Sequence, residues 1–325
     1  MGKYLVTGAA GFIGAKVSEL LLQEGHAVIG VDNLNDAYDL RLKYWRLNQL
    51  NDRPGFVLFQ KDIASLESLE EIASQAGKIN GIINLAARAG VRASVENPWI
   101  FLETNTTGTL NLLEVARRYE IPKLVLASTS SIYGANAPLP TPESAESSFP
   151  LQPYAASKKA AEAMSYSYHF LHGIDVTVFR YFTVFGPAGR PDMVMFRFCQ
   201  WIAEGRPVHL NGDGEQSRGF TYVEDIARGT IAGLKPLGYE IINLGGHEVI
   251  TINNMIAVLE KMLGKKANIV RHPAHPADMM TNWADVTRAR EMLGWEPRVG
   301  LQEGIQHLVD WYMKERSWAS LVETP

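Results

Sequence analysis

The N-terminal segment of the chain combines a short apolar run, a glycine-rich turn and an amphipathic stretch, in that order. The run Lys3–Thr7 continues into the sequence GAAGFIG, whose glycines have the spacing GxxGxxG. Glycines so placed allow a tight turn, a close approach of the backbone to a pyrophosphate and close packing of a helix on a strand. The following helix would offer free N–H groups and a positive dipole to the same anion. The order predicts a dinucleotide-binding strand, turn and helix, although such glycines also occur in plain turns.

Short β-rich runs and longer amphipathic segments alternate through the first half of the chain. This alternation is typical of parallel βαβ units with right-handed crossovers and helices on both faces of the sheet. We predict strands near 3–7, 27–31, 56–60, 80–84, 123–127 and 175–180. We predict helices near 12–24, 65–76, 97–119 and 154–172. The fold class is therefore α/β, a doubly wound parallel sheet of the Rossmann type.

The rhythm of the sequence changes near residue 180, where proline and glycine interrupt the pattern more often. We expect residues 1–180 to form the dinucleotide-binding domain, with 222–245 returning to it. We expect residues 181–325 to form a smaller α/β lobe that binds a substrate. Its predicted helices lie near 193–204, 253–263 and 301–314.

Composition restricts the partners that the chain can have. With 31 Lys+Arg against 35 Asp+Glu and a net charge of -4, no broad attraction to nucleic acid or an anionic membrane is expected. The single cysteine, Cys199, excludes an intramolecular disulfide, and no cluster of metal ligands is visible. The sequence shows neither a secretory signal pattern nor a long apolar span, so we expect a cytoplasmic protein without a metal.

An acidic residue ends the second predicted strand. Asp32 follows Gly14 by 18 residues and could accept hydrogen bonds from the ribose hydroxyls of adenosine. It would repel a 2'-phosphate, and residues 33–36 contain no arginine to offset that repulsion. The pattern favours NAD over NADP; a solvated aspartate after a strand is the alternative interpretation.

Tyr154 and Lys158 are four residues apart and would lie on one face of a helix. A tyrosine is a poor base at neutral pH unless a nearby positive charge favours the phenolate, and Lys158 could provide that charge. The pair follows a predicted strand end that carries the run 128–131, Ser-Thr-Ser-Ser, where a parallel sheet binds ligands. A hydroxyl there could hold a reacting oxygen near Tyr154, although serine-rich strand ends also form turns or helix caps.

Several motifs together resemble the extended short-chain dehydrogenase/reductase family, over essentially the whole chain. They are TGAAGFIG, Asp32, NLAA at 84–87, STSSIYG at 128–134, YAASK at 154–158 and RYFTVFGP at 180–187. Within that family, the blocks AGVRASVENP at 89–98 and GPAGRPDM at 186–193 are most similar to UDP-glucuronate 4-epimerases. The resemblance implies an NAD-dependent nucleotide-sugar epimerase.

The resemblance assigns a role to individual residues of this chain. The implied catalytic residues are Thr129, Tyr154 and Lys158, with Tyr154 as the base. The implied NAD contacts are Gly8, Gly11, Phe12, Ile13, Gly14, Asp32, Asn33, Asp62, Ile63, Leu85, Ala86, Ala87, Asn105, Ser128, Tyr154, Lys158 and Tyr181. The implied contacts of the UDP-sugar are Arg92, Thr129, Ser130, Ser131, Thr183, Arg190, Arg218 and Asp278. Two positions depart from the family pattern: Asn84 stands where histidine is frequent, and Gly219 where aspartate often follows the phosphate-binding arginine.

The implied reaction is an oxidation at the sugar C4, rotation of a bound 4-keto sugar and return of hydride to its other face. Related dehydratases carry an Asp-Glu pair after the catalytic threonine and decarboxylases a glutamate, whereas Ser130 and Ser131 are neutral. With Thr183, these serines could hydrogen-bond a uronate carboxylate, which favours conversion of UDP-glucuronate to UDP-galacturonate.

Other interpretations stay open from the sequence. Three other kinds of protein share most of these motifs: a UDP-glucose/UDP-galactose 4-epimerase, a UDP-glucuronate decarboxylase and a non-enzymatic, NAD-binding regulatory protein. The resemblance also implies a homodimer in which helices 97–119 and 154–172 of two subunits form a four-helix bundle.

Overall fold

A seven-stranded, entirely parallel sheet forms the centre of the computed structural model, which describes residues 1–273 and 280–324. The strand order is β10-β6-β5-β4-β1-β2-β3. The strands are β1 (Lys3–Thr7), β2 (Ala27–Val31), β3 (Phe56–Phe59), β4 (Gly81–Asn84), β5 (Lys123–Thr129), β6 (Asp175–Tyr181) and β10 (Tyr239–Leu244). The order reverses between β1 and β4, and parallel sheets bind ligands at such a switch point. The predicted doubly wound α/β fold is confirmed.

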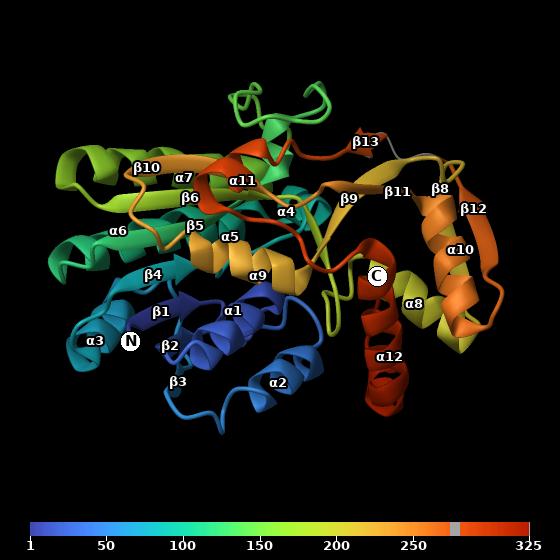
Figure 1. The fold of residues 1–325 in the computed structure, drawn as a ribbon, viewed down its shortest axis with the longest axis horizontal. Coiled ribbons are helices and arrows are strands. Elements are labelled where there is room, and N and C mark those ends of the chain that lie inside the picture. Colours follow the sequence, from blue (N-terminus) through green and yellow to red (C-terminus); the bar gives the residue numbers. More distant parts are fainter. Residues whose placement is uncertain (274–279, 325) are drawn as a thin grey trace.

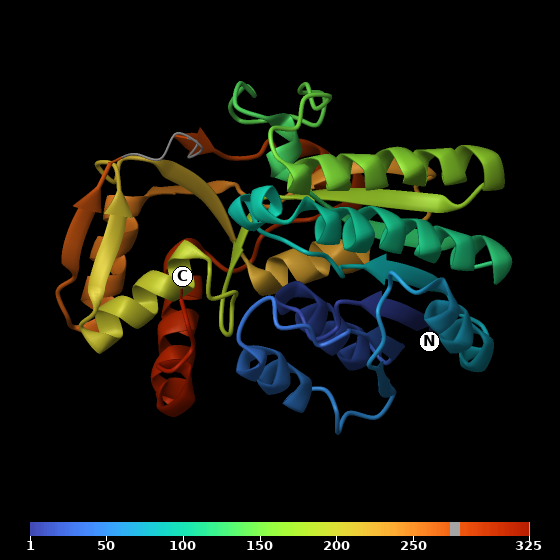
Figure 2. The same ribbon diagram turned by 180° about the vertical axis from the view of Figure 1, so that it is seen from behind.

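Helices cover both faces of this sheet (Figures 1 and 2). One layer contains α1 (Phe12–Gln23), α9 (Val223–Ala232) and α11 (Thr287–Leu293); the other contains α3 (Leu66–Ala76), α6 (Gly108–Arg118) and α7 (Pro153–His172). Consecutive strand residues face opposite layers, as the pleat requires. Leu5 and Leu124 pack with the second layer, whereas Val6 and Val125 pack with the first. This two-sided burial explains why the strands read as continuous apolar runs.

The segment predicted as a single helix over 97–119 is divided into three. Pro98–Phe101 forms α5, Leu102–Thr107 forms the π-helix η1, and α6 follows. The hydroxyl of Thr109 donates to the Asn105 carbonyl at 2.7 Å, a back-bond that bends helices. Hydrophobic periodicity cannot reveal a π turn of this length, because a π turn shifts the pattern by only one residue.

A helix that the sequence analysis does not predict, α2 (Leu40–Asn48), lies beside α1 (Figure 1). Its buried face contains Lys43 and Arg46 as well as Leu42 and Leu47. Two cations on the inward face weaken the apolar repeat by which an amphipathic helix is recognised.

A second lobe packs against the carboxyl ends of the strands (Figure 1). Its larger sheet contains β7 (Thr183–Phe185), β9 (Ser217–Tyr222), β11 (Glu248–Thr251) and β13 (Thr281–Asn282). A two-stranded sheet pairs β8 (Pro207–Asn211) with β12 (Asn268–His272). The helices α8 (Val194–Glu204), α10 (Ile252–Leu263) and α12 (Leu301–Ala319) share a core centred on Phe196, Trp311 and Tyr312. Within the described residues, no helix is long and apolar enough to cross a membrane.

Candidate active site

The glycine turn between β1 and α1 has no room for a Cβ at its glycine positions. Gly8 has a φ of +68°, and a Cβ there would lie 2.8 Å from the Ala86 backbone nitrogen. A Cβ on Gly14 would lie 2.1 Å from the Gly8 carbonyl oxygen. The N-cap of α1, Gly11, makes no side-chain capping bond, and the first N–H groups of a helix have no partner inside it. The turn can therefore bring its backbone N–H groups against a diphosphate.

Asp32 lies at the end of β2 and is buried. Its carboxylate accepts hydrogen bonds from the backbone N–H groups of Ala10 at 3.1 Å and Leu34 at 2.9 Å. The ammonium of Lys43, from α2, lies 3.2 Å from the same carboxylate. Both side chains are buried, with 5% of Lys43 and 6% of Asp32 exposed. Asp32 is thus held in place by the glycine turn and by α2.

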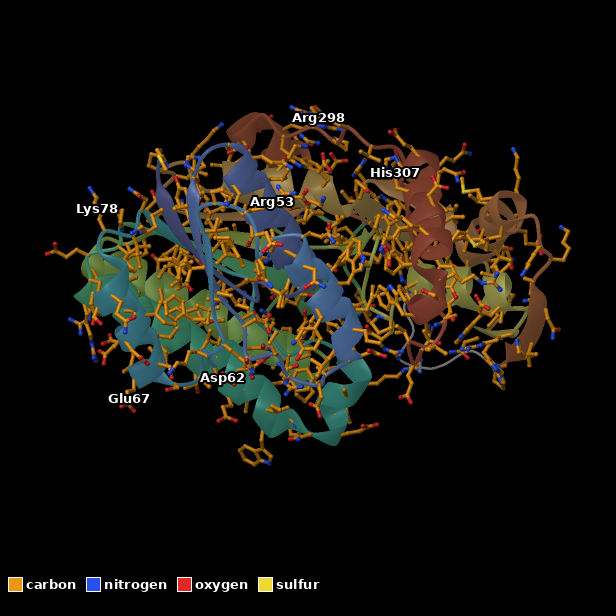
Figure 3. All side chains as sticks on the ribbon, turned by 90° about the horizontal axis from the view of Figure 1, so that it is seen from below. Arg53, Asp62, Glu67, Lys78, Arg298 and His307 are labelled. Carbon is orange, nitrogen blue, oxygen red and sulfur yellow. The ribbon has the colours of Figure 1, made fainter. Side chains whose placement is uncertain are left out.

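The adjacent strand ends contribute an acidic and an amide side chain. Asn33 donates to Asp62 at 2.7 Å, which joins the ends of β2 and β3; Figure 3 labels Asp62. Asp62 also accepts from the Ala64 N–H at 2.8 Å. These residues lie just beyond the carboxyl ends of β2 and β3, where the sequence analysis expects part of the cofactor site.

Asn84 joins the ends of β1 and β4. Its amide oxygen accepts from the Thr7 hydroxyl at 2.7 Å and its amide nitrogen donates to the Thr109 hydroxyl at 3.1 Å. The Thr7 hydroxyl in turn accepts from the Ala86 N–H at 3.1 Å. An asparagine satisfies its buried hydrogen-bonding groups here, which gives a physical reason for the departure from histidine.

Asn105 connects the π-helix to the helix that carries Tyr154. Its side chain is buried, exchanges two hydrogen bonds with the Arg88 backbone and donates to the Ser157 hydroxyl at 2.9 Å. Ser157 donates to the Tyr154 carbonyl at 2.8 Å. The amide of Asn105 is therefore occupied by protein groups, and its role is to support the start of α7.

Thr129, Tyr154 and Lys158 lie together where β5 meets α7. The Thr129 hydroxyl lies close enough to the Tyr154 phenol to act on its pKa. Lys158 is buried and its ammonium donates to the Ala127 carbonyl at 2.9 Å. Burial raises the pKa of Tyr154, while the Thr129 hydroxyl and the charge of Arg190 act to lower it. The phenol therefore needs further positive charge from its surroundings to act as a base at neutral pH.

Two side chains that the sequence analysis expects near the cofactor are held elsewhere. The Ser128 hydroxyl donates to Glu162 at 2.5 Å. The Tyr181 hydroxyl is 2.7 Å from the Thr230 hydroxyl, inside the layer that contains α9. The pleat turns these two side chains toward the helix layers on the faces of the sheet. Only the backbone groups of Ser128 and Tyr181 therefore remain at the strand ends to contact a ligand.

Residues of the second lobe approach the end of β5. Thr183 on β7 and Arg218 on β9 belong to neighbouring strands of the larger sheet. Asn282 lies beside Arg218 in register, and its amide donates to the Ser130 hydroxyl at 3.4 Å. The Ser131 hydroxyl accepts from the Thr129 hydroxyl at 3.2 Å. The end of β5 and the second lobe are thus linked by side chains.

Arg190 lies on the loop that follows β7. Its guanidinium forms an ion pair with Asp192, and its charge acts on Tyr154 and Tyr38. Arg92 lies on α4 (Val91–Glu96) with an exposed side chain. The predicted substrate residue Asp278 lies outside the described residues.

A family model described as "NAD dependent epimerase/dehydratase family" matches residues 4–245. A UDP-glucuronate 4-epimerase of Thermodesulfobacterium geofontis is 56% identical over 312 residues, which cover 96% of each chain. The chain belongs to the NAD-dependent epimerase/dehydratase family.

Two solved structures resemble the chain over nearly its full length. The UDP-glucuronic acid 4-epimerase from Bacillus cereus, in complex with UDP-glucuronic acid and NAD, is 34% identical with a TM-score of 0.89. The matching region covers 96% of this chain and 99% of the chain of that structure. The UDP-glucose 4-epimerase from Thermotoga maritima with UDP-glucose is 33% identical, also with a TM-score of 0.89, over 97% and 99% of the two chains. The predicted family resemblance is confirmed.

Gly219, the second departure from the family pattern, has a steric reason in this epimerase/dehydratase. A Cβ at this position would lie 2.0 Å from the carbonyl oxygen of Gly246. The backbones of β9 and the loop before β11 therefore meet where an aspartate would not fit. Arg218 keeps its place on β9, where it donates to the Ser217 carbonyl at 2.8 Å.

Sequence reasoning missed four residues around this epimerase/dehydratase site. Lys43 and Arg46 come from the unpredicted helix, Asn282 from a two-residue strand, and Glu162 from the helix that carries Lys158. For Glu162 a signal was present, because it lies four residues after Lys158 and on the same helix face. For the other three, only the tertiary fold reveals the contact.

Proposed function

We propose that this protein is an NAD-dependent isomerase that converts UDP-glucuronate to UDP-galacturonate by epimerisation at C4. The observation that carries the proposal is the meeting of Thr129, Tyr154 and Lys158 with the neutral hydroxyls of Ser130 and Ser131. The similar proteins named as UDP-glucuronate 4-epimerases support the choice of sugar.

The residues of the first domain fit NAD. We assign residues 1–180 and 222–245 to the cofactor domain and the remainder of 181–325 to the UDP-sugar lobe, apart from α11, which packs on the central sheet. In this proposal the glycine turn faces the diphosphate, Asp32 the adenosine ribose, and the carboxyl ends of β4 and β5 the nicotinamide side. The cofactor residues are those expected from the sequence, except that the side chains of Asn105, Ser128 and Tyr181 are bonded to other protein groups. NAD, when bound, supplies the reversible oxidation of the sugar at C4.

Tyr154 is the proposed acid and base at the sugar O4. It accepts the proton when the 4-hydroxyl is oxidised and returns it when the 4-keto group is reduced from the other face. Thr129 holds the same oxygen by a hydrogen bond, and Lys158 supplies the positive charge that makes the phenolate accessible.

The uronate carboxylate has to be held still, because a 4-keto uronic acid is a β-keto acid that can lose carbon dioxide. We propose that Thr183, Ser130 and Ser131 donate hydrogen bonds to this carboxylate, and that Arg92, Arg190, Arg218 and Asp278 complete the UDP-sugar site. Neutral donors bind the carboxylate without strongly favouring its loss. The absence of acidic side chains at 130 and 131 disfavours a dehydratase or a decarboxylase.

The substrate proposal is tested by product analysis with UDP-glucuronate and UDP-glucose. We expect wild type to form UDP-galacturonate with little carbon dioxide or UDP-pentose, and to convert UDP-glucose poorly. Thr183→Val should lose roughly 10- to 100-fold in kcat/KM with the acid, since a hydrogen bond to a charged group contributes about 1.5–3 kcal/mol. The loss with UDP-glucose should be smaller. A wild-type preference for UDP-glucose, or pentose as the main product, would contradict the hexuronate assignment.

The rate of epimerisation should fall as the pH rises above about 8. Burial lowers the pKa of Lys158 from 10.5 to about 8, although Glu162 opposes the shift. Deprotonation of Lys158 removes the charge that favours the Tyr154 phenolate. Between pH 10.5 and about 8, the unfolded chain binds more protons at Lys158 than the folded chain does, so the contribution of Lys158 to folding stability rises with pH. Loss of the fold at this site therefore does not explain the lost rate. A rate that still increases up to about pH 10, measured with NAD bound, would show that Lys158 is not required in its charged form.

We also propose that the protein is a cytoplasmic homodimer. Aromatic and aliphatic side chains project from α5, η1 and α7: Trp99, Leu102 and Phe170 are 77%, 41% and 75% exposed. An exposed apolar surface on neighbouring helical elements is typical of a subunit interface. Phe170→Asp should yield the mass of a monomer in light scattering, whereas Met313→Asp on α12 should leave a dimer. A monomeric wild type would exclude this assembly.

A further inference from the structure

We propose that Arg46 is a positioning residue that holds the glycine turn of the cofactor site and the Arg190 loop in one arrangement, so that binding at one site strengthens binding at the other. This inference rests on the proposed function for the identity of the two ligands. Arg46 lies on α2 and only 3% of its surface is exposed.

Arg46 bonds to both loops. Its Nη1 atom donates to the Ala10 carbonyl at 3.0 Å, inside the glycine turn, and to the Tyr38 hydroxyl at 2.8 Å. Its Nε and Nη2 atoms donate to the Ala188 carbonyl at 3.0 and 2.6 Å. Ala10 and Ala188 are far apart in the sequence, and the planar guanidinium spans them because its donors point in fixed directions.

The Ala188 end of this contact bears on the substrate side of the site. Ala188 has a φ of +51°, an uncommon conformation for a residue with a Cβ, which persists only when the surroundings hold it. Arg190 follows two residues later, and its charge acts on the Tyr154 phenol. A shift of the Ala188 carbonyl therefore moves the arginine that faces the catalytic tyrosine.

The electrostatic setting of Arg46 points to function rather than to an ordinary structural ion pair. No carboxylate of residues 1–273 or 280–324 forms an ion pair with it. Its guanidinium lies 5.5 and 5.9 Å from the ring centres of Tyr38 and Phe12. A buried cation with only neutral partners leaves a net positive charge behind the glycine turn, which favours a diphosphate on the other side.

The geometry also distinguishes Arg46 from a lysine. A lysine would keep the charge behind the turn, but its single nitrogen cannot reach the Ala10 and Ala188 carbonyls in the fork arrangement. Arg46→Lys therefore separates the charge of this residue from its bridging contact. Arg46→Met removes both.

The experiment measures how UDP affects the release of NAD from wild type, Arg46→Lys and Arg46→Met. We expect UDP to slow NAD release from wild type at least about fivefold, the lower end for coupling between sites. In Arg46→Lys this effect should fall below about twofold, with KM for UDP-glucuronate raised at least about fivefold. Arg46→Met should in addition retain less NAD after purification. Arg53→Met is the matched control, since Arg53 follows α2 with a 36% exposed side chain (Figure 3), and it should behave as wild type.

Several outcomes would overturn the proposal. One is an Arg46→Lys variant with the coupling and KM of wild type. Another is a wild type whose NAD release is insensitive to UDP. If both Arg46 variants fail to fold, the role of Arg46 is structural only. Thermal unfolding and circular dichroism check the fold. If NAD and UDP binding are coupled through Arg46 but UDP-glucuronate is not epimerised, the proposed function fails and the positioning role stands.

Discussion

Tyr154→Phe is expected to lower the rate of UDP-glucuronate epimerisation at least about 100-fold, the lower range for loss of a general base. The substitution removes the only oxygen of this side chain, whose pKa the Thr129 hydroxyl and the charge of Arg190 act to lower. The aromatic ring remains and keeps its edge contact with Phe101, whose ring centre lies 6.2 Å away. The fold and the bound NAD should therefore be preserved.

The measurement compares initial rates and NAD content of Tyr154→Phe with those of wild type and Tyr166→Phe. Tyr166 lies on the same helix with a 52% exposed side chain, and its loss of a hydroxyl should not change the rate. Activity of Tyr154→Phe within about tenfold of wild type would show that another group takes the proton from O4. Loss of NAD together with activity would instead assign Tyr154 a role in holding the cofactor.

The parts of the site that the sequence predicts depend on local geometry. The glycine turn requires glycine because the Gly8 and Gly14 positions have no room for a Cβ, and the spacing of these residues records that constraint. Tyr154 and Lys158 share a helix face for the same local reason. Parallel strands then bring their carboxyl ends to one edge, which explains how Asp32 could be placed there from its position after a strand.

The parts that the sequence does not predict depend on which face or neighbour a side chain meets. Ser128 and Tyr181 stand at strand ends, but the pleat turns their hydroxyls toward Glu162 and Thr230. Arg46 lies in a segment whose helical pattern is hidden by its own inward-facing charge. Tertiary contacts decide these orientations, and no periodicity of a single segment contains them.

The second large effect concerns the buried pair of Glu162 and Arg180. Arg180→Met is expected to lower the free energy of unfolding by about 3 kcal/mol, the lower end for breaking a buried pair, because it leaves the buried carboxylate with only the partly exposed Lys159 ammonium, 3.6 Å away, as an ion-pair partner. Both side chains are 2% exposed, and Arg180 donates to the two carboxylate oxygens at 3.1 and 2.9 Å. The Ser128 hydroxyl would also remain as a hydrogen-bond donor to Glu162. Urea unfolding of the purified protein measures the change.

The double variant Glu162→Met/Arg180→Met separates two free-energy changes: the cost of removing only the cation, and the contribution of the whole ion pair. It should recover much of the stability lost in Arg180→Met, since replacing a buried pair by apolar side chains is often close to neutral. Arg316→Met breaks the partly exposed pair with Glu204, whose side chains are 44% and 16% exposed, and should cost at most about 1 kcal/mol. If Arg180→Met is as mild as Arg316→Met, the Glu162 carboxylate is accommodated without its cation. In that case, pairing with the buried Glu162 carboxylate would not be the reason why Arg180 stabilises the fold at the end of β5.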